Sequence, residues 1–314
     1  MIQLLRLGGV SAGAAGLAAW LNGRSRRPGE PQPWTVRPNF QVPAIPGFPT
    51  MVVVQGDDPA RLVRRAFEEL GGIRRFISRG DTVTIKPNAA WDRTPEQAAN
   101  TNPLVVGEVA RLCREAGARR VFVADVSIND PERSFARSGI AAAAAAAGAE
   151  VILPSPRLFR QVDLRGRVLN VWPVLEPFLR AGKLINIPIA KHHSLTGVTL
   201  GMKNWYGILG GPRQELHQRI HECIADLADF MRPTLTLLDA YRVLLRHGPG
   251  GGDFADVVLK RTLIAGTDPV AVDAYAADAW WNLDAASLPY LQLAAGRGLG
   301  TVQFETVATR FVKV

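Results

Sequence analysis

Beyond about residue 50, the chain alternates short apolar runs with longer segments whose apolar residues recur at helical spacing. The β-branched run at 51–55 precedes a segment, 58–70, with apolar residues every three or four positions. The alternation continues, with strands predicted at 82–85, 121–124, 151–153, 184–189, 235–238 and 263–265 and helices at 103–116, 132–147, 214–230 and 269–281. Apolar strands alternating with helices predict an α/β fold: a mostly parallel sheet with helices on both faces, a Rossmann-like three-layer arrangement.

The first fifty residues follow a different pattern. Residues 7–23 carry no charge and are rich in small side chains, which is typical of a signal-peptide core rather than of a transmembrane helix. The run Leu4-Leu5-Arg6-Leu7-Gly8-Gly9 resembles the end of a twin-arginine export signal, although the arginine pair itself is missing. We therefore expect a signal-like or anchor segment at 1–27, with an exported or membrane-anchored, periplasmic protein, or a cytoplasmic one if the segment is not a working signal.

Seven of the 22 prolines lie in residues 28–49, which predicts an extended linker there and a folded domain at 50–314. The formal net charge is +9, but residues 1–50 contribute five arginines against one glutamate. The remaining excess of positive charge is spread over the other 264 residues, so we do not expect nucleic-acid binding. Cys113 and Cys223 stand alone, so neither a disulfide framework nor an iron–sulfur cluster is expected within this chain.

Polar side chains follow the predicted strands at the points where these end: Lys86, Asn88, Asp125, Lys191, His192, His193 and Asp239. In sheets of this kind, ligands bind at the carboxyl ends of the strands. Lysine is scarce, with six copies, and three of them (Lys86, Lys191 and Lys203) lie in or beside these loops. An amine there can bind an anion, or act as a base when it is desolvated; the alternative is three ordinary loop lysines.

All five histidines lie between His192 and His247. His217 and His221 are four residues apart on a predicted helix, a spacing that suits two metal ligands, although two surface histidines would look the same. The glycine-rich run 248–252 can bring backbone amides close to an anion or serve as a flexible connection, and it matches no phosphate-loop motif. Asp268 caps a predicted helix, whereas Asp273, one turn further, has no such structural role.

Several motifs occur together along the chain: Lys86-Pro87-Asn88, the strand 184–189 leading to Lys191-His192-His193, Leu195-Thr196-Gly197, Lys203-Asn204-Trp205-Tyr206-Gly207, Gly248-Pro249 and the segment 268–273. Together they resemble the DUF362 family, a domain of unknown function, over about residues 50–285. The resemblance assigns the family's later histidine to His217 and gives His221 no counterpart. Family members often carry a ferredoxin-like iron–sulfur segment, which this chain lacks, so any cluster would belong to a separate partner protein.

Two classes of function remain open. The first is an enzyme that acts on a small anionic substrate by lysine and histidine acid–base chemistry or with a divalent metal. Its expected catalytic residues are Lys191, His193, His217, Asp239 and Asp273, its expected substrate-binding residues are Lys86, Asn88, Asp125, Lys203, Asn204, Gly248 and Gly250, and its expected metal ligands are His217 and His221. The second is an exported, non-catalytic ligand- or metal-binding protein, or an accessory subunit of a redox complex.

Overall fold

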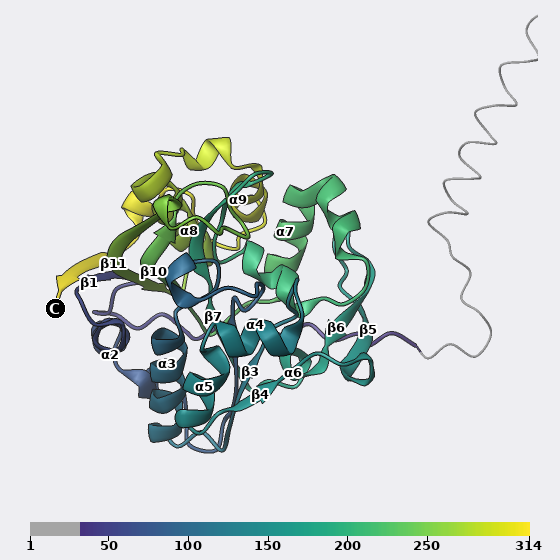
Figure 1. The fold of residues 1–314 in the computed structure, drawn as a ribbon, viewed down its shortest axis with the longest axis horizontal. Helices are drawn as coiled ribbons and strands as arrows, with labels where there is room; N and C mark the ends of the chain where they lie inside the picture. Colours follow the sequence, from purple (N-terminus) through teal and green to yellow (C-terminus); the bar gives the residue numbers. More distant parts are fainter. Residues whose placement is uncertain (1–31) are drawn as a thin grey trace, which may run out of the picture. The chain divides into compact units, whose positions relative to one another are not determined.

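A ten-stranded sheet crosses the part of the protein that the computed structural model describes, residues 32–314 (Figure 1). Its main strands follow the order β12 (Thr309–Lys313), β1 (Met51–Gln55), β11 (Val257–Gly266), β10 (Leu235–Leu244), β7 (Lys183–Ile187), β2 (Thr82–Pro87), β3 (Arg120–Ala124) and β4 (Glu150–Ile152). β8 (Ile189–His193) lies parallel to β10 and pairs with β9 (Gly197–Thr199). From β10 to β4 every neighbouring pair is parallel, whereas β11 is antiparallel to both of its neighbours.

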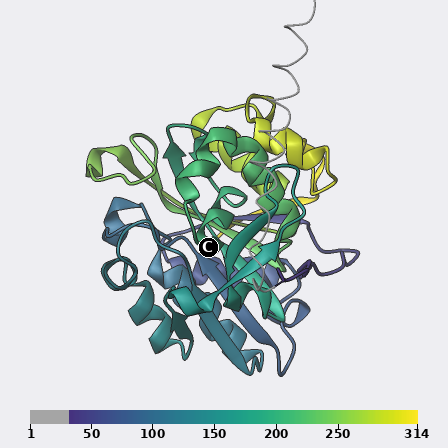
Figure 2. The same cartoon turned by 90° about the vertical axis from the view of Figure 1, so that its right-hand side faces the viewer.

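Helices cover both faces of this sheet, as the alternation of apolar segments predicts. One layer holds α2 (Pro59–Glu69), α3 (Pro103–Glu115), α4 (Pro131–Arg137) and α5 (Ile140–Ala146), and the other holds α7 (Ile220–Phe230), α8 (Pro269–Trp281) and α9 (Pro289–Ala295). Alternate side chains of β1 show the division between the two layers. Val52 and Val54 pack in the core on the side of α2 and α3, while Met51 and Val53 pack in the core on the side of α7 and α8. Figure 2 shows the green and yellow helices on one side and the blue and teal helices on the other. The predicted three-layer α/β fold is confirmed.

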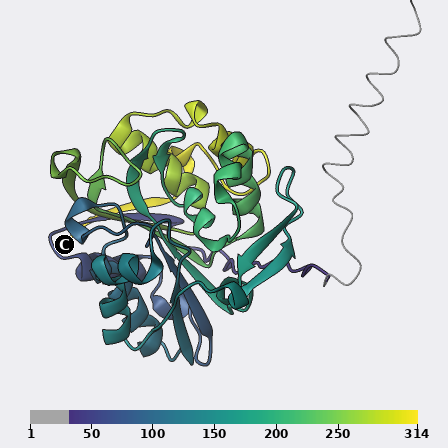
Figure 3. The same cartoon turned by 45° about the vertical axis from the view of Figure 1, so that its right-hand side comes forward.

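Several elements differ from the predicted pattern. The helix expected at 132–147 is split into α4 and α5 at Gly139, whose φ of 75° is not helical. The strand expected at 184–189 is split into β7 and β8 at Pro188, which has no N–H to donate. The helix expected at 214–230 starts as the 3₁₀ helix η5 (Arg213–Arg219), and α7 follows it. An unforeseen antiparallel hairpin, β5 (Phe159–Asp163) and β6 (Val171–Leu175), precedes the short α6 (Glu176–Leu179) (Figure 3).

Residues 34–49, which the proline content assigns to a linker, belong to the same compact unit as the rest of the domain. The Trp34 N–H donates to the carbonyl of Gln161 at 2.8 Å, and Phe40 is buried in the core. The folded unit therefore begins at Trp34 rather than near Thr50, because apolar side chains between the prolines bind this segment to the domain. The signal-like segment predicted at 1–27 lies outside the described residues. Within 32–314, no helix has the length and apolar character needed to cross a membrane.

Candidate functional site

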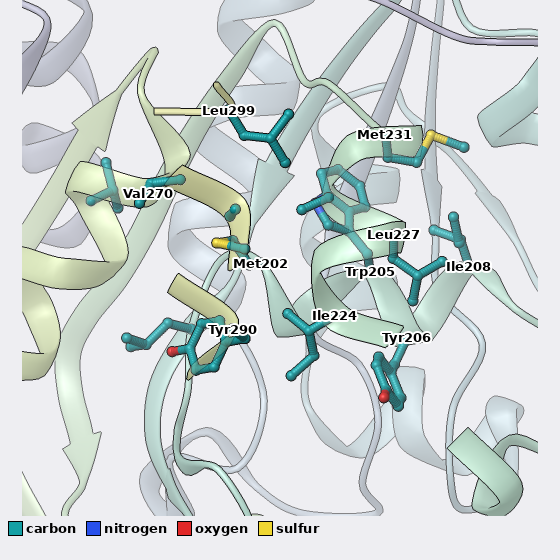
Figure 4. Packing of buried hydrophobic residues seen from close by; sticks show 14 of the residues in the cluster. Met202, Trp205, Tyr206, Ile208, Ile224, Leu227, Met231, Val270, Tyr290 and Leu299 are labelled. Carbon is teal, nitrogen blue, oxygen red and sulfur yellow. The ribbon is translucent and has the colours of Figure 1, made fainter. Parts of the chain in front are cut away.

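A cavity of about 250 Å³ lies at the carboxyl edge of the parallel strands. β2 and β3 end there and are followed directly by wall residues of the cavity, while β8 contributes two side chains from one of its faces. The 3₁₀ helices η4 (Lys203–Ile208) and η5 supply most of the opposite wall, and Figure 4 shows how Trp205 of η4 packs beside α7. The lining consists of Asn88, Ala90, Trp91, Asp125, Val126, Ile128, Lys191, His193, Thr199, Lys203, Asn204, Tyr206, Gly207, Arg213, His217 and Pro249.

Lys86 forms a buried ion pair with Asp125 beside this cavity. The Nζ atom lies 2.7 Å from Oδ1 of Asp125 and also donates to the carbonyl of Pro87 at 2.6 Å and to Oδ1 of Asn204 at 3.2 Å. Burial lowers the pKa of Lys86, and the charge of Asp125 counteracts that effect. Gly207 packs against the pair so closely that a Cβ atom there would lie 1.9 Å from Oδ1 of Asp125.

A chain of asparagine amides holds the next lysine of the site. Asn186 accepts a hydrogen bond from Nδ2 of Asn204 at 2.8 Å, and Oδ1 of Asn204 accepts one from Nδ2 of Asn88 at 3.0 Å. The amide nitrogen of Asn88 is thereby used, so its oxygen faces Lys191, which donates to it at 2.9 Å. The three amides thus orient a hydrogen-bond acceptor toward the Lys191 amine.

Lys191 differs from Lys86 in the number and charge of its partners. Its Nζ donates to Oδ1 of Asn88 and, at 2.5 Å, to the carbonyl of Ala99, and within residues 32–314 it forms no ion pair with a carboxylate. Burial lowers the pKa of Lys191 well below its ordinary value; Lys203 acts in the same direction, and Asp125 opposes both. Burial and the neighbouring Lys203 therefore favour the neutral amine over the ammonium form.

Lys203 and Arg213 are the cations of the cavity. The Nζ atom of Lys203 lies 4.9 Å from the ring centroid of Tyr206 and, in the described part of the chain, makes no hydrogen bond or ion pair. Burial, together with Arg213, lowers the pKa of Lys203 to about 8, so the amine is mostly protonated at neutral pH. Arg213 donates to the carbonyls of Val126 and Ser127, each at 2.7 Å, and likewise has no carboxylate partner among the described residues.

His193 and His217 face each other at the cavity. The two rings are nearly parallel, at 7°, with centroids 6.4 Å apart. Nδ1 of His193 accepts the backbone N–H of Leu195 at 3.1 Å, which places the proton of the neutral ring on Nε2. Burial, followed by the charges of Lys203 and Lys191, lowers the pKa of His193 to about 2, so this ring is a neutral hydrogen-bond donor. His217 is exposed to solvent and lies at the rim.

The structure places His217 and His221 in different surroundings, and the expected pair of metal ligands stays a prediction. His217 lies on η5, where three residues complete a turn, so a residue four positions on no longer shares its face. The ring of His221, on α7, instead stacks on Tyr290 at a centroid distance of 6.1 Å. Among residues 32–314, no group of three or more His, Cys, Asp or Glu side chains is arranged to hold a metal ion.

Asp239 and Asp273 lie outside the cavity wall and hold backbone amides. Asp239 accepts the N–H groups of Asn102, at the start of α3, and Tyr241, and burial raises its pKa to about 6. Asp273 accepts those of Gly201 and Met202 at 2.7 and 2.9 Å, and burial raises its pKa to about 7. Since Met202 precedes Lys203, Asp273 is a positioning residue for the site. The catalytic role expected for the two aspartates stays a prediction, and the contacts seen here are structural.

The glycines of the 248–252 loop also act indirectly. The Gly248 N–H donates to Nδ1 of His192 at 3.2 Å, and a Cβ atom at Gly248 would lie 2.0 Å from the carbonyl oxygen of His192. Gly250 packs against the ring of Trp91, and a Cβ atom at Gly250 would lie 3.2 Å from that ring. Neither glycine lines the cavity, whereas Pro249 and Trp91 do. The two glycines therefore affect the cavity wall only by letting the loop pack closely against its neighbours.

Several wall residues escape the sequence analysis. Gly207 and Tyr206 belong to the motif 203–207, but the motif assigns neither of them a role in the site, and for Gly207 the role comes from its contact with the ion pair. Arg213 is one of 31 arginines, and no pattern distinguishes it. Trp91 and Tyr206 look like ordinary core aromatics in the sequence. Signals for these residues lie in tertiary contacts, which spacing along the chain does not reveal.

Comparisons with known proteins agree with the motifs. A thylakoid-associated protein of Synechocystis sp. is 28% identical over 258 residues, covering 77% of this chain and 76% of that protein. Two solved structures align at TM-scores of 0.42 and 0.40: the lactate racemase apoprotein of Thermoanaerobacterium thermosaccharolyticum, at 13% identity, and a Thermotoga maritima protein, at 14%. The alignments cover 73% and 72% of this chain, which spans 55% and 59% of those two proteins. Residues 83–278 match the model of the domain of unknown function DUF362, and the chain belongs to that family.

Proposed function

We propose that the protein is an enzyme that binds a small organic anion in this cavity and acts on it by lysine and histidine acid–base chemistry. The observation that carries the proposal is that one cavity holds Lys191, whose amine contacts only uncharged acceptors, beside two cations, Lys203 and Arg213, that form no ion pair within residues 32–314. Burying a charge without a partner costs free energy. Such cations are stabilised when an anion binds between them.

The size and lining of the cavity support a small ligand with an apolar part. The cavity volume of about 250 Å³ is just below the roughly 300–1,000 Å³ of typical ligand sites, and one part of the wall is formed by Trp91, Val126, Ile128 and Pro249. A polyphosphate would leave this apolar wall without contacts. A short carboxylic acid satisfies both the cations and the apolar wall.

Lys191 and His193 supply the chemistry in this proposal. Burial favours the neutral form of Lys191, and in that form the amine can accept a proton from a carbon or oxygen atom of the ligand. The Nε2–H of His193 can donate a hydrogen bond to an oxygen atom that gains negative charge during the reaction. Exposed His217, at the rim, gives protons a route between the cavity and solvent.

Binding of lactate and propionate by calorimetry tests the anion site. Lys203→Met should weaken binding by about tenfold or more, because a hydrogen bond to a charged group contributes about 1.5–3 kcal/mol. Lys313→Met, on the exposed edge strand β12, is the matched control and should leave binding unchanged. Failure of both carboxylates to bind at millimolar concentration would contradict the proposal.

Proton exchange separates an enzyme from a binding protein. Lactate and propionate incubated with the protein in D₂O should exchange the hydrogen next to the carboxylate, followed by NMR, and Lys191→Met should abolish this exchange while anion binding persists. Binding of both carboxylates without exchange would favour the non-catalytic ligand-binding protein.

We also propose that the chain works at a membrane surface. The signal-like composition of residues 1–27 and the similarity to a protein described as thylakoid-associated support this. Fractionation of cells that express the full chain, compared with a chain starting at Gln32, tests it: only the full chain should sediment with membranes.

A further inference from the structure

We propose that Lys191 is a nucleophile that forms a Schiff base with the carbonyl carbon of a small 2-oxo acid whose carboxylate lies against Lys203 and Arg213. This inference rests on the anion site of the proposed function and narrows its ligand to an acid with a carbonyl group next to the carboxylate. It adds a covalent intermediate to the acid–base chemistry.

The hydrogen-bond partners of the lysines carry the argument. The amine of Lys86 has three oxygen partners, one of them the carboxylate of Asp125, which suits the three hydrogens of an ammonium group. The amine of Lys191 has two, the amide oxygen of Asn88 and the carbonyl of Ala99, and both are uncharged. Two acceptors match the two hydrogens of a neutral amine and leave its lone pair free.

The surroundings of Lys191 keep this lone pair available to a ligand. Lys191 is 1% exposed and lines the cavity, so a ligand in the cavity, rather than bulk water, would contact this side chain. The burial and the neighbouring Lys203 that lower its pKa are the two conditions under which lysine acts as a nucleophile in proteins.

Lys203 has a different role, because its amine has no oxygen partner among residues 32–314 and lies over the ring of Tyr206. A cation in this position attracts the carboxylate of the ligand. With the carboxylate held there and by Arg213, the adjacent carbonyl carbon of a 2-oxo acid lies one bond away, and Lys191 lines the same small cavity. Binding in this way makes the attack effectively unimolecular.

The step balances with no reactant other than the oxo acid and a proton. The lone pair of Lys191 forms a C–N bond while the carbonyl π electrons move to oxygen, which accepts a hydrogen bond from Nε2–H of His193. One proton passes from nitrogen to that oxygen and gives the carbinolamine. A proton from solvent then lets the hydroxyl group leave as water, and the C=N bond forms. The remaining N–H of the iminium keeps one of the two original acceptors.

Reductive trapping on the wild-type protein tests the inference directly. The full chain is incubated with pyruvate and sodium cyanoborohydride at neutral pH, digested, and mapped by mass spectrometry, which is simple because the chain has six lysines. We expect an N-carboxyethyl group on Lys191 and at most trace labelling of Lys260 and Lys313. Lactate, which has no carbonyl group, should give no adduct. Labelling spread evenly over the lysines would overturn the inference.

Variants and a separate binding measurement distinguish this inference from the proposed function. Lys203→Met should reduce the Lys191 adduct by about tenfold or more, because the carboxylate loses its main charge partner. Lys313→Met should leave the adduct unchanged. If calorimetry shows pyruvate binding that depends on Lys203 but Lys191 stays unlabelled, the Schiff base is refuted and the anion site stands. If pyruvate, lactate and propionate neither bind nor react, both proposals fail. The wild-type mapping remains decisive even if Lys191→Met does not fold.

Discussion

Replacing Gly207 with alanine should break the buried ion pair between Lys86 and Asp125. The new Cβ atom would lie 1.9 Å from Oδ1 of Asp125 and 2.7 Å from Nζ of Lys86, and both side chains are fully enclosed. Because atoms do not approach a Cβ closer than about 3 Å, the carboxylate has to move by about 1 Å. That movement is large against an ion-pair distance of 2.7 Å.

The cost follows from what the two groups lose. Breaking a buried ion pair costs about 3–5 kcal/mol, because each charge stays buried without its partner. Oδ2 of Asp125 also accepts the Ala89 N–H at 2.6 Å, so rotation of the carboxylate disturbs a second contact. We therefore expect the free energy of unfolding to fall by about 3 kcal/mol or more, a large share of the roughly 5–15 kcal/mol of a typical domain.

Urea unfolding followed by tryptophan fluorescence measures this loss. Gly296→Ala is the matched control, because its φ of −63° accepts alanine and its nearest neighbour to a new Cβ lies at 3.3 Å. That control should change the unfolding free energy by less than about 1 kcal/mol. If Gly207→Ala unfolds at the same urea concentration as the wild type, the tight packing of Gly207 against the ion pair is refuted.

Three other predictions concern the wall and its supports. Burial raises the pKa of Asp273 from 3.8 to about 7, so the folded state retains a proton that the unfolded state loses. The free energy of unfolding should therefore fall as pH rises from about 4 to 7. Urea unfolding of Asp273→Asn should show a weaker pH dependence than that of the wild type. His221→Ala should leave lactate binding unchanged by calorimetry, because His221 stacks on Tyr290 rather than facing the cavity, and a loss of binding would contradict this. Trp91→Phe should weaken propionate binding severalfold through lost apolar contact, whereas an unchanged dissociation constant would remove Trp91 from the ligand wall.

The fold could be predicted because its signals are local. The alternation of apolar strands and helices can be read from residues close together in the sequence. It predicts that helices cover both faces of the sheet. The splits at Gly139 and Pro188 escaped the pattern, although both residue types are known to interrupt elements. Few apolar residues, such as Phe40, lie between the prolines and pack residues 34–49 against the domain. The high proline content therefore led to the prediction of a linker there.

The site could be predicted in part, because strand ends are visible in the sequence and contacts between distant loops are not. Asn88, Asp125, Lys191 and His193 follow from the rule that parallel strands end at one edge. Asp239 follows the predicted strand 235–238 in the same way, yet it lies inside the longer β10 and its two oxygens accept backbone N–H groups. Whether a carboxylate at a strand end faces a cavity depends on which N–H groups lie beside it, and this is a tertiary property.

The three lysines that the sequence treats alike differ in the structure by the acceptors around each amine. Lys86 has three partners, including a carboxylate, and is a structural cation. Lys191 has two uncharged partners, which suits the base or nucleophile that we propose, whereas Lys203 has none within the described residues, which suits a cation for an anionic ligand. The proposed roles require a neutral amine at Lys191 and ammonium groups at Lys86 and Lys203 at the same pH. Exchanging the partners should therefore exchange the roles: Asn88→Asp would place a carboxylate beside Lys191, raise its pKa and suppress adduct formation with pyruvate, while the cations that bind the carboxylate stay in place.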